Sequence, residues 1–294
     1  MIDLEALPTW GSLLRDATRT LASGGVPAPR RAAVWLLGDV LGCSAAHLIA
    51  YPDREVSRKH LRTIAPLLER CAAREPIQYV LGSVDFCGMR LRVTPDVLIP
   101  RPETEQVVET ALRHLPAGAY ARVLDIGSGS GCIALAIKRA RPNAGVTAVD
   151  VSAAALSVAK QNAKIHDLAI TFLHADMLAP DFVRQVSGSW DLIVSNPPYL
   201  AWEEASLLEP EIRDHEPEVA LFSGADPLQH YRAIASNVPK MLAANGCCVL
   251  EVHAHRADAV ADLLRSAGLR SVAGQPDLAG LPRIVSGRWH GVGG

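Results

Sequence analysis

Two stretches of the sequence combine residue types that could bind a small ligand and act on it. In the first, Asn196-Pro197-Pro198-Tyr199 follows the apolar run Trp190–Ser195. Pro197 and Pro198 lack an amide hydrogen and fix φ, so they end a strand and leave its last carbonyl groups free of the sheet. The side-chain oxygen of Asn196 and the carbonyl of Pro197 can together accept both hydrogens of an NH₂ group, and Tyr199 can stack on the planar group that carries it. The stretch is therefore a candidate catalytic and substrate-binding site for a planar amine or amide.

The second stretch is a glycine-rich loop between the apolar run Val123–Ile126 and a helical pattern that begins near Cys132. Glycines let the chain turn tightly and let a ligand approach the backbone, with the helix N-terminus directly behind. A dinucleotide fingerprint, G-x-G-x-x-G, would require glycine at position 132, but that position is cysteine and the third glycine comes one residue earlier. The loop is therefore a candidate site for another ligand, and its residues are Gly127, Ser128, Gly129, Ser130 and Gly131.

The spacing G-x-G-x-G after an acidic residue resembles the cofactor loop of S-adenosylmethionine-dependent methyltransferases. The resemblance implies that Asp150 accepts hydrogen bonds from the ribose hydroxyls, that Asp176 accepts from the adenine amino group and that Met177 packs on the adenine. It also implies that Asn196 lies beside the methyl donor. Each residue has a simpler alternative: Asp150 could cap the helix that begins near Ala153, Asp176 could be a solvated turn residue, and Met177 could belong to the core.

Three further motifs resemble the peptide chain release factor glutamine methyltransferases of the PrmC/HemK family. They are E-P-I-Q-Y at Glu75–Tyr79 followed by Gly82, V-L-I-P-R-P-E-T-E at Val97–Glu105, and E-I-R-D-H-E-P at Glu211–Pro217. The resemblance extends from the helical N-terminal region to the C-terminus. It implies S-adenosyl-L-methionine as the cofactor, release factors as partners, and methylation of the glutamine in their Gly-Gly-Gln motif.

Two other activities share N-P-P-Y. In the glutamine methyltransferase of a large-subunit ribosomal protein, the proline-arginine stretch continues with serine-proline, whereas this chain has Pro102-Glu103-Thr104-Glu105. An adenine amino-methyltransferase acting on nucleic acid ordinarily needs a basic channel and a way to extrude a base. The net charge of −2 argues against a nucleic-acid substrate. A non-catalytic adaptor would not need the glycines, Asp150 and N-P-P-Y to be intact.

One segment departs from the family pattern. After the fifth strand the family usually has a glycine behind the glutamate and a glutamine shortly after, whereas this chain has E-V-H-A-H-R at Glu251–Arg256. The geometry of this loop, which contains His253-Ala254-His255, is left open. His253 and His255 have no third metal ligand in evident reach, so we expect no metal site.

The glutamine amide nitrogen is a poor nucleophile because its lone pair is delocalised into the carbonyl. Hydrogen bonds from its NH₂ group to Asn196 and to the Pro197 carbonyl would orient the nitrogen and stabilise the positive charge that develops on it. Tyr199 is expected to act as a packing wall, because an unperturbed phenol titrates near 10. The sequence presents no evident general base.

The pattern that must position these residues begins at Ala121, where strands and helices alternate. We predict an α/β fold with a seven-stranded, mostly parallel, Rossmann-like methyltransferase sheet and helices on both faces, so that the loops above meet at the carboxyl ends of the strands. The predicted strands are Arg122–Asp125, Gly145–Asp150, Ala169–His174, Trp190–Ser195, Cys247–His253, Leu269–Ala273 and Arg283–Arg288, and the predicted helices are Cys132–Ala140, Ala153–Ile165, Leu228–Val238 and Ala257–Ala267.

The residues before this region predict two smaller parts. Residues 1–82 have apolar residues at helical spacing and are expected to form a small N-terminal helical bundle of about four or five helices. The basic residues of this part form either a solvated helical surface or a docking face for a partner, and we expect the bundle to dock the substrate. Residues 83–100 are expected to form a β-hairpin connector, and residues 101–294 the methyltransferase domain. Arg101, Glu103 and Glu105 either line the substrate channel or pair with nearby surface charges.

Composition sets the remaining expectations. The six cysteines form no CxxC pair, which indicates reduced core thiols. The N-terminus has no basic segment followed by an apolar core, and no apolar stretch reaches about 18 residues, so we expect a cytoplasmic protein without a membrane contact. We also expect a monomer.

Overall fold

The computed structural model describes residues 7–277 and 280–291. By the contacts between residues, the chain divides into two compact units. The first comprises the described part of Met1–Ser83 together with the later segment Glu209–His215, and the second comprises Val84–Leu208 and the described residues from Glu216 onward. The chain therefore leaves the second unit after Leu208, contributes a short segment to the first unit, and returns at Glu216.

The first unit is a helical bundle, as the sequence predicts. Thr9 and Ser12 form a capping box at the first helix, and Gly42 ends the second with a positive φ of 65° that a side chain would disfavour. Its core contains Leu13, Leu37 and Ile64, all at most 1% exposed. Its helices are α1 (Trp10–Ser23), α2 (Pro29–Leu41), α3 (Ala45–Ala50), α4 (Arg58–Ala72), α5 (Ile77–Leu81) and the short α10 (Pro210–Arg213).

The predicted β-hairpin is present as β1 (Ser83–Phe86) and β2 (Met89–Arg92). Its two turn residues, Cys87 and Gly88, both have positive φ, at 46° and 68°, as a tight two-residue hairpin turn requires. In the second strand Met89 and Leu91 are buried, and the arginines that alternate with them are exposed. The hairpin therefore has one face in the core and one in solvent.

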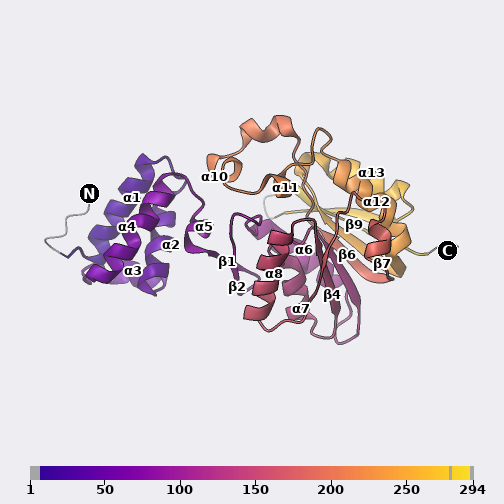
Figure 1. Cartoon of the computed structure of the whole chain (residues 1–294), viewed down its shortest axis with the longest axis horizontal. Coiled ribbons are helices and arrows are strands. Elements are labelled where there is room, and N and C mark those ends of the chain that lie inside the picture. Colours follow the sequence, from indigo (N-terminus) through magenta and orange to yellow (C-terminus); the bar gives the residue numbers. More distant parts are fainter. Residues whose placement is uncertain (1–6, 278–279, 292–294) are drawn as a thin grey trace. The chain divides into compact units, whose positions relative to one another are not determined.

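A seven-stranded sheet forms the centre of the second unit (Figure 1), in the order β5-β4-β3-β6-β7-β9-β8. All neighbouring pairs are parallel except β7–β9 and β8–β9. The first strand of this sheet along the chain, β3, lies inside the sheet, and the chain builds outward to β5 on one side of it before it crosses to β6 on the other. The strands are β3 (Arg122–Ile126), β4 (Gly145–Asp150), β5 (Thr171–His174), β6 (Trp190–Ser195), β7 (Leu242–Glu251), β8 (Arg270–Pro276) and β9 (Pro282–Arg288).

Helices cover both faces of this sheet (Figure 1) and bury two apolar cores. On one face α6 (Pro102–Arg113), α7 (Cys132–Ala140) and α8 (Ala153–Ile165) pack against side chains such as Val123 and Val194. The opposite face is covered by α9 (Phe182–Gln185), α12 (Gln229–Met241) and α13 (Ala257–Ser266). The α/β fold that strand–helix alternation predicts is confirmed.

Strand boundaries differ from the prediction mainly at β7. It begins at Leu242, where it pairs with Trp190, and a bulge between Trp190 and Leu192 restores the register further along. It ends at Glu251 instead of His253, because the chain turns into the 3₁₀ helix η2 (Ala254–Arg256). Among the described residues, no helix has the length and apolar character to cross a membrane. All six cysteines lie in the described part and are free.

Candidate active site

A cleft opens at the carboxyl ends of β3, β4, β5 and β6, and all its lining residues belong to the second unit. The empty space of the cleft is about 940 Å³, a figure that includes open solvent at its mouth. The chain builds in opposite directions from β3 and β6, so the loops after these two strands diverge and leave a crevice. The residues predicted from the sequence that line the cleft are Gly127, Ser128, Gly129, Ser130, Asp150, Asp176, Met177, Asn196 and Pro198.

The glycine loop after β3 runs along the wall of this cleft. The amides of Gly127 and Ser128 donate to the carbonyl of Val149, at 2.8 and 3.0 Å, which ties the loop to the end of β4. Gly131 has a φ of 82°, and a Cβ there would lie 3.1 Å from the Cβ of Ala159 on α8. Glycine at this position therefore permits both the turn and the close packing of two helices.

Asp125, on β3 just before the glycines, caps the helix that follows them. Gly131 is the N-cap of α7 and has no side chain for this purpose. Asp125 Oδ2 instead accepts from the amide of Ala134, at 3.2 Å, near the helix N-terminus, where a carboxylate interacts favourably with the helix dipole. Asp125 is fully buried, and burial raises the pKa of its carboxyl to about 7. Its second oxygen, Oδ1, accepts no hydrogen bond from any described residue.

Asp150, at the end of β4, holds two backbone segments that line the cleft. Its Oδ2 accepts from the amide of Gly129, at 2.8 Å, and its Oδ1 accepts from the amide of Ser152, at 2.9 Å. The cap of α8 is Ser152, whose hydroxyl accepts from Ala155. The alternative that Asp150 caps this helix is therefore wrong. Burial raises the pKa of Asp150, and the two amides oppose that rise.

The loop after β5 contributes Asp176 and Met177. Asp176 is exposed, and its Oδ1 accepts from the amide of Leu178, at 2.8 Å, so it stabilises a local turn and lines the cleft at the same time. Met177 is half-buried, and its Cε lies 3.6 Å from the position a Cβ would take on Gly127. The methionine therefore packs across the glycine loop.

Asn196 and the two prolines follow β6 at the point where this strand leaves the sheet. Ser195, the last residue of β6, donates from its hydroxyl to the carbonyl of Ile126 in β3, at 2.6 Å. Asn196 is half-buried and lines the cleft, and its carboxamide makes no hydrogen bond to another described residue. Its donor and acceptor groups are therefore free to bind a ligand.

Three predicted site residues are not in the cleft lining: Gly131, Pro197 and Tyr199. Pro197 is buried, and Tyr199 is half-buried with its ring 5.8 Å from the ring of His253. Burial raises the pKa of the Tyr199 phenol, with a further contribution from the nearby Glu251. Tyr199 is therefore protonated at neutral pH, and its packing role toward a substrate stays a prediction.

The three charged residues suggested for a substrate channel are not in the cleft lining either. Arg101 pairs with the buried carboxylate of Glu216, and Glu105 accepts from the amide of Cys87, at 2.6 Å. These two residues make structural contacts. Glu216 also accepts from the amide of Ile99, at 3.3 Å, so this buried charge braces the segment 97–100 that lines the cleft.

Several lining residues were not predicted individually, among them Thr104 and His230. Behind Thr104 lies Glu251, which is 4% exposed and accepts from the Thr104 hydroxyl at 2.7 Å. Ser195 pairs with Leu250, so Asn196 and Glu251 are the next residues along two neighbouring strands. Burial raises the pKa of the Glu251 carboxyl to about 7. The motif V-L-I-P-R-P-E-T-E includes Thr104, but nothing in its pattern indicates that Glu251 lies behind it.

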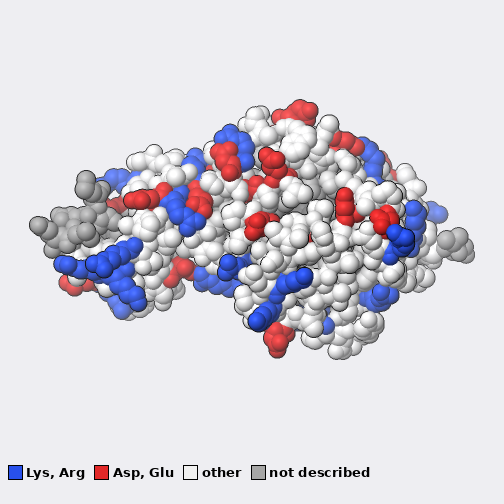
Figure 2. Space-filling model, in the orientation of Figure 1, with Lys and Arg blue, Asp and Glu red and all other residues white. Residues whose placement is uncertain are grey.

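The cleft presents several groups that can form hydrogen bonds to a ligand. Carboxylates stand at the ends of successive strands, backbone amides and small residues lie between them, and a free carboxamide lies at the end of β6. Within the described ranges, no three His, Cys, Asp or Glu residues are grouped so that they could hold a metal ion. On the face drawn in Figure 2, acidic and basic side chains are interspersed over the second unit, with no continuous basic surface among its described residues there.

Comparison with known proteins defines the class and then the family. Residues 105–209 match the family described as methyltransferase small domain, and residues 12–82 match the PrmC N-terminal domain. A methyltransferase from Pyrococcus furiosus has the same fold, with a TM-score of 0.52 and 18% identity over 70% of this chain and 90% of that chain. The second unit is thus a methyltransferase domain of the α/β class.

Relatives that match nearly the whole chain identify its family more narrowly. It is 42% identical to the release factor glutamine methyltransferase of Bordetella pertussis, over 94% of this chain and 99% of the relative. It is also 42% identical to that of Cereibacter sphaeroides, over 94% and 96%. The chain belongs to the release factor glutamine methyltransferase family, as its N-P-P-Y, V-L-I-P-R-P-E-T-E and E-I-R-D-H-E-P motifs suggest.

Proposed function

We propose that this protein transfers a methyl group from S-adenosyl-L-methionine to the side-chain amide nitrogen of the glutamine in the Gly-Gly-Gln motif of peptide chain release factors. The observation that carries the proposal is a free carboxamide, that of Asn196, lining the same cleft as the glycine loop, in a chain of this family. The ribosomal-protein and adenine substrates remain the alternatives that the assay below separates.

The residues of the cleft fit the proposed cofactor. The hydroxyl of Ser128 lines the cleft, is buried and has no hydrogen-bond partner among the described residues, so it is available to a bound ligand. Asp150 would accept from the ribose hydroxyls, because each of its oxygens makes one hydrogen bond and retains a second acceptor site. Asp176 would accept from the adenine amino group, and Met177 would pack on the ring. When bound, the cofactor supplies an electrophilic methyl group.

The chain's own contribution to the reaction is to bind and orient the substrate amide. The side-chain oxygen of Asn196 and the carbonyl of Pro197 accept the two amide hydrogens, which turns the nitrogen toward the methyl group. These acceptors also stabilise the positive charge that develops on nitrogen, and such an interaction strengthens in the transition state. The buried position of Pro197 and Pro198 keeps the two acceptors in place.

The first unit is proposed to dock the protein substrate. It carries a set of exposed basic side chains (Figure 2), which are Arg30, Arg31, Arg54, Arg58, Lys59, Arg62 and Arg70. A protein substrate can be held through such a charged surface, and these basic side chains are the face that we propose for it. Residues 1–82 thus have the docking role, 83–100 the connector role and 101–294 the catalytic role.

The test is transfer of a labelled methyl group to three substrates in parallel: a release factor, the large-subunit ribosomal protein and duplex DNA. We expect one methyl group on the Gly-Gly-Gln glutamine, located by mass spectrometry. Asn196→Ala should lower the turnover number by about 100- to 1,000-fold, with the cofactor dissociation constant within about twofold of the wild type. Labelling of the ribosomal protein or DNA in place of the release factor would refute the proposed substrate.

A further inference from the structure

The loop that carries Asn196 has few backbone contacts of its own. Pro197 and Pro198 have no amide hydrogen, so they cannot donate to a neighbouring strand. The loop is held on its N-terminal side by the Ser195 hydroxyl, which donates to the carbonyl of Ile126. The position of the loop therefore depends on the contacts that hold the chain on its C-terminal side, immediately after Tyr199.

Arg256 makes the first contact on that side. Its Nη1 donates to the carbonyl of Tyr199, at 2.8 Å, and its Nη2 donates to Glu204 Oε2, at 2.6 Å. The guanidinium is planar and its two donors are fixed relative to each other, so it holds the carbonyl and the carboxylate in one geometry. The side chains of Arg256 and Glu204 are only 16% and 27% exposed, so solvent screens this pair less than a pair on the open surface.

Glu204 completes the connection. The same Oε2 accepts from the amide of Ala201, at 2.7 Å. One carboxylate thus joins Arg256 to the backbone two residues beyond Tyr199. Leu200, between them, is held on both sides, because its amide donates to Leu221 and its carbonyl accepts from Ser223.

The segment that provides Arg256 is the one that departs from the family pattern. His253, at its start, lies with its ring 5.8 Å from that of Tyr199 and 5.3 Å from that of His255. Glu251, the last residue of β7, accepts from the Thr104 hydroxyl, and Arg256, the last residue of η2, donates to the carbonyl of Tyr199. Arg256, the last residue of this segment, thus reaches the Asn196–Tyr199 loop.

We propose that Arg256 and Glu204 form a clamp that fixes the Asn196–Tyr199 loop in the orientation needed for methyl transfer, an inference that rests on the proposed function. Both act as positioning residues, because they contact the loop and not the reacting atoms. The clamp fixes the peptide group of Tyr199 and so the course of the chain back to the Pro197 carbonyl. A displacement of this acceptor by about 1 Å is enough to slow transfer by about 100-fold.

The variants that test the clamp are Arg256→Ala, Arg256→Lys and Glu204→Gln. The matched control is Arg265→Ala, which removes an arginine of α13 whose pair with Asp262 is 54% and 74% exposed. For each, the turnover number and KM for a release factor, the cofactor dissociation constant and the unfolding temperature are measured. The milder lysine and glutamine variants preserve a test if the alanine variant does not fold.

We expect Arg256→Ala to lower the turnover number by about 10- to 100-fold, while KM and the cofactor dissociation constant stay within about twofold. Arg256→Lys should restore part of the activity, because an ammonium keeps the charge without the fixed fork. The double variant Arg256→Ala/Glu204→Gln should be no slower than Arg256→Ala by more than about twofold, because the two residues act as one unit. A turnover number equal to that of Arg265→Ala, or a change confined to KM or to the unfolding temperature, would overturn the clamp.

A failure of the clamp and a failure of the proposed function are distinguishable. If the wild type methylates none of the substrates, the proposed function fails, and amide hydrogen exchange still tests the clamp. Faster exchange of the Leu200 and Ala201 amides in Arg256→Ala than in Arg265→Ala would support it. Equal exchange in both would refute it.

Discussion

Asp150→Ala offers the sharpest test of the cofactor site, because one carboxylate performs two tasks there. It holds the amides of Gly129 and Ser152, at 2.8 and 2.9 Å, and it would present its remaining acceptor sites to the ribose. A hydrogen bond to a charged acceptor contributes about 1.5–3 kcal/mol. Loss of one or two such bonds to the ligand, together with a looser glycine loop, should therefore weaken binding by about 3 kcal/mol, or about 100-fold in the dissociation constant.

The assay is isothermal calorimetry with S-adenosylmethionine on protein shown to be folded by its unfolding transition. Asp191→Ala is the matched control, because Asp191 Oδ2 also accepts a backbone amide, that of Arg122, at 2.7 Å, but at the opposite edge of the same sheet, where β3 and β6 begin. Its dissociation constant should stay within about twofold of the wild type. An unchanged dissociation constant in folded Asp150→Ala would remove this residue from the site.

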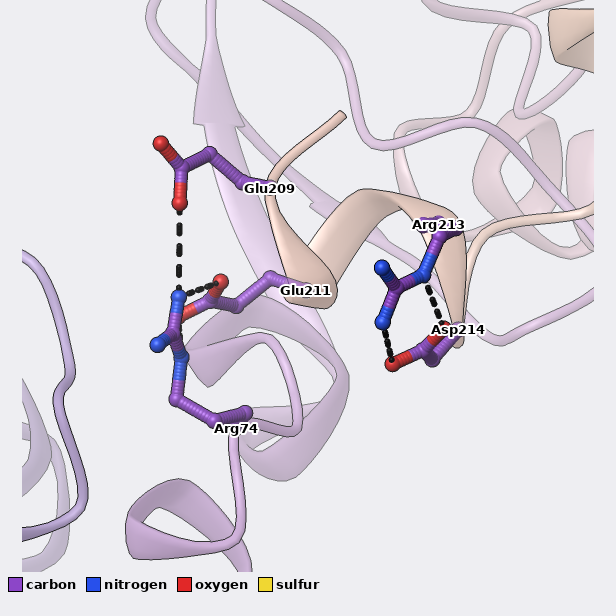
Figure 3. A network of polar contacts seen from close by, with 5 residues as sticks. All are labelled: Arg74, Glu209, Glu211, Arg213 and Asp214. Carbon is purple, nitrogen blue, oxygen red and sulfur yellow. Dashed lines mark hydrogen bonds and ion pairs between the residues drawn. The ribbon is translucent and has the colours of Figure 1, made fainter. Parts of the chain in front are cut away.

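Two further predictions concern stability. Burial raises the pKa of Glu251 from 4.5 to about 7. Between these pH values the folded state keeps a proton that the unfolded chain has lost. The free energy of unfolding of the wild type should therefore fall by up to about 3 kcal/mol relative to that of Glu251→Gln as pH rises from 4 to 8. Urea unfolding of both proteins at several pH values measures this, and a difference that does not change with pH would contradict it. In the first unit, Arg74 donates to both oxygens of Glu211, at 2.6 and 2.5 Å (Figure 3). Arg74→Ala should therefore speed amide hydrogen exchange in Glu209–His215 and lower the free energy of unfolding by about 1 kcal/mol. The control is Arg213→Ala, which removes the exposed pair with Asp214 shown in Figure 3 and should lower the free energy of unfolding by less than about 0.5 kcal/mol. Equal changes in exchange and in stability for the two variants would refute the role of Arg74.

Much of the fold follows from patterns that are local in the sequence. Gly145–Asp150 and Trp190–Ser195 are strands with the predicted bounds, because each is a short apolar run ended by a residue that leaves the sheet. The helices Cys132–Ala140 and Ala153–Ile165 also match, since the first starts after glycine and the second after a serine cap. Alternation of such elements is enough to predict a parallel sheet, and hence a cleft at its carboxyl edge.

The residues that the sequence did not reveal act through contacts between distant segments. Glu251 lies behind Thr104, 147 residues away in the chain, and Glu216 accepts from Ile99, 117 residues away. Asp125 is next to the glycine motif, but its role as the cap of α7 depends on the strand and the helix packing together. Periodicity predicts which face of an element is buried, but it does not specify which side chain on another element will meet it.

These distant contacts explain why the loops of the cleft can be rich in glycine and proline without being loosely held. The segment 97–100 is braced by Glu216, the glycine loop by Asp150, and the Asn196 loop by Ser195 on one side and Arg256 on the other. Glu216, Asp150 and Arg256 each come from another segment and bind a backbone group of the loop, whereas Ser195 joins the end of its own strand to the carbonyl of Ile126. The catalytic groups can then be few and uncharged, because their orientation is set by the residues that hold the backbone beneath them.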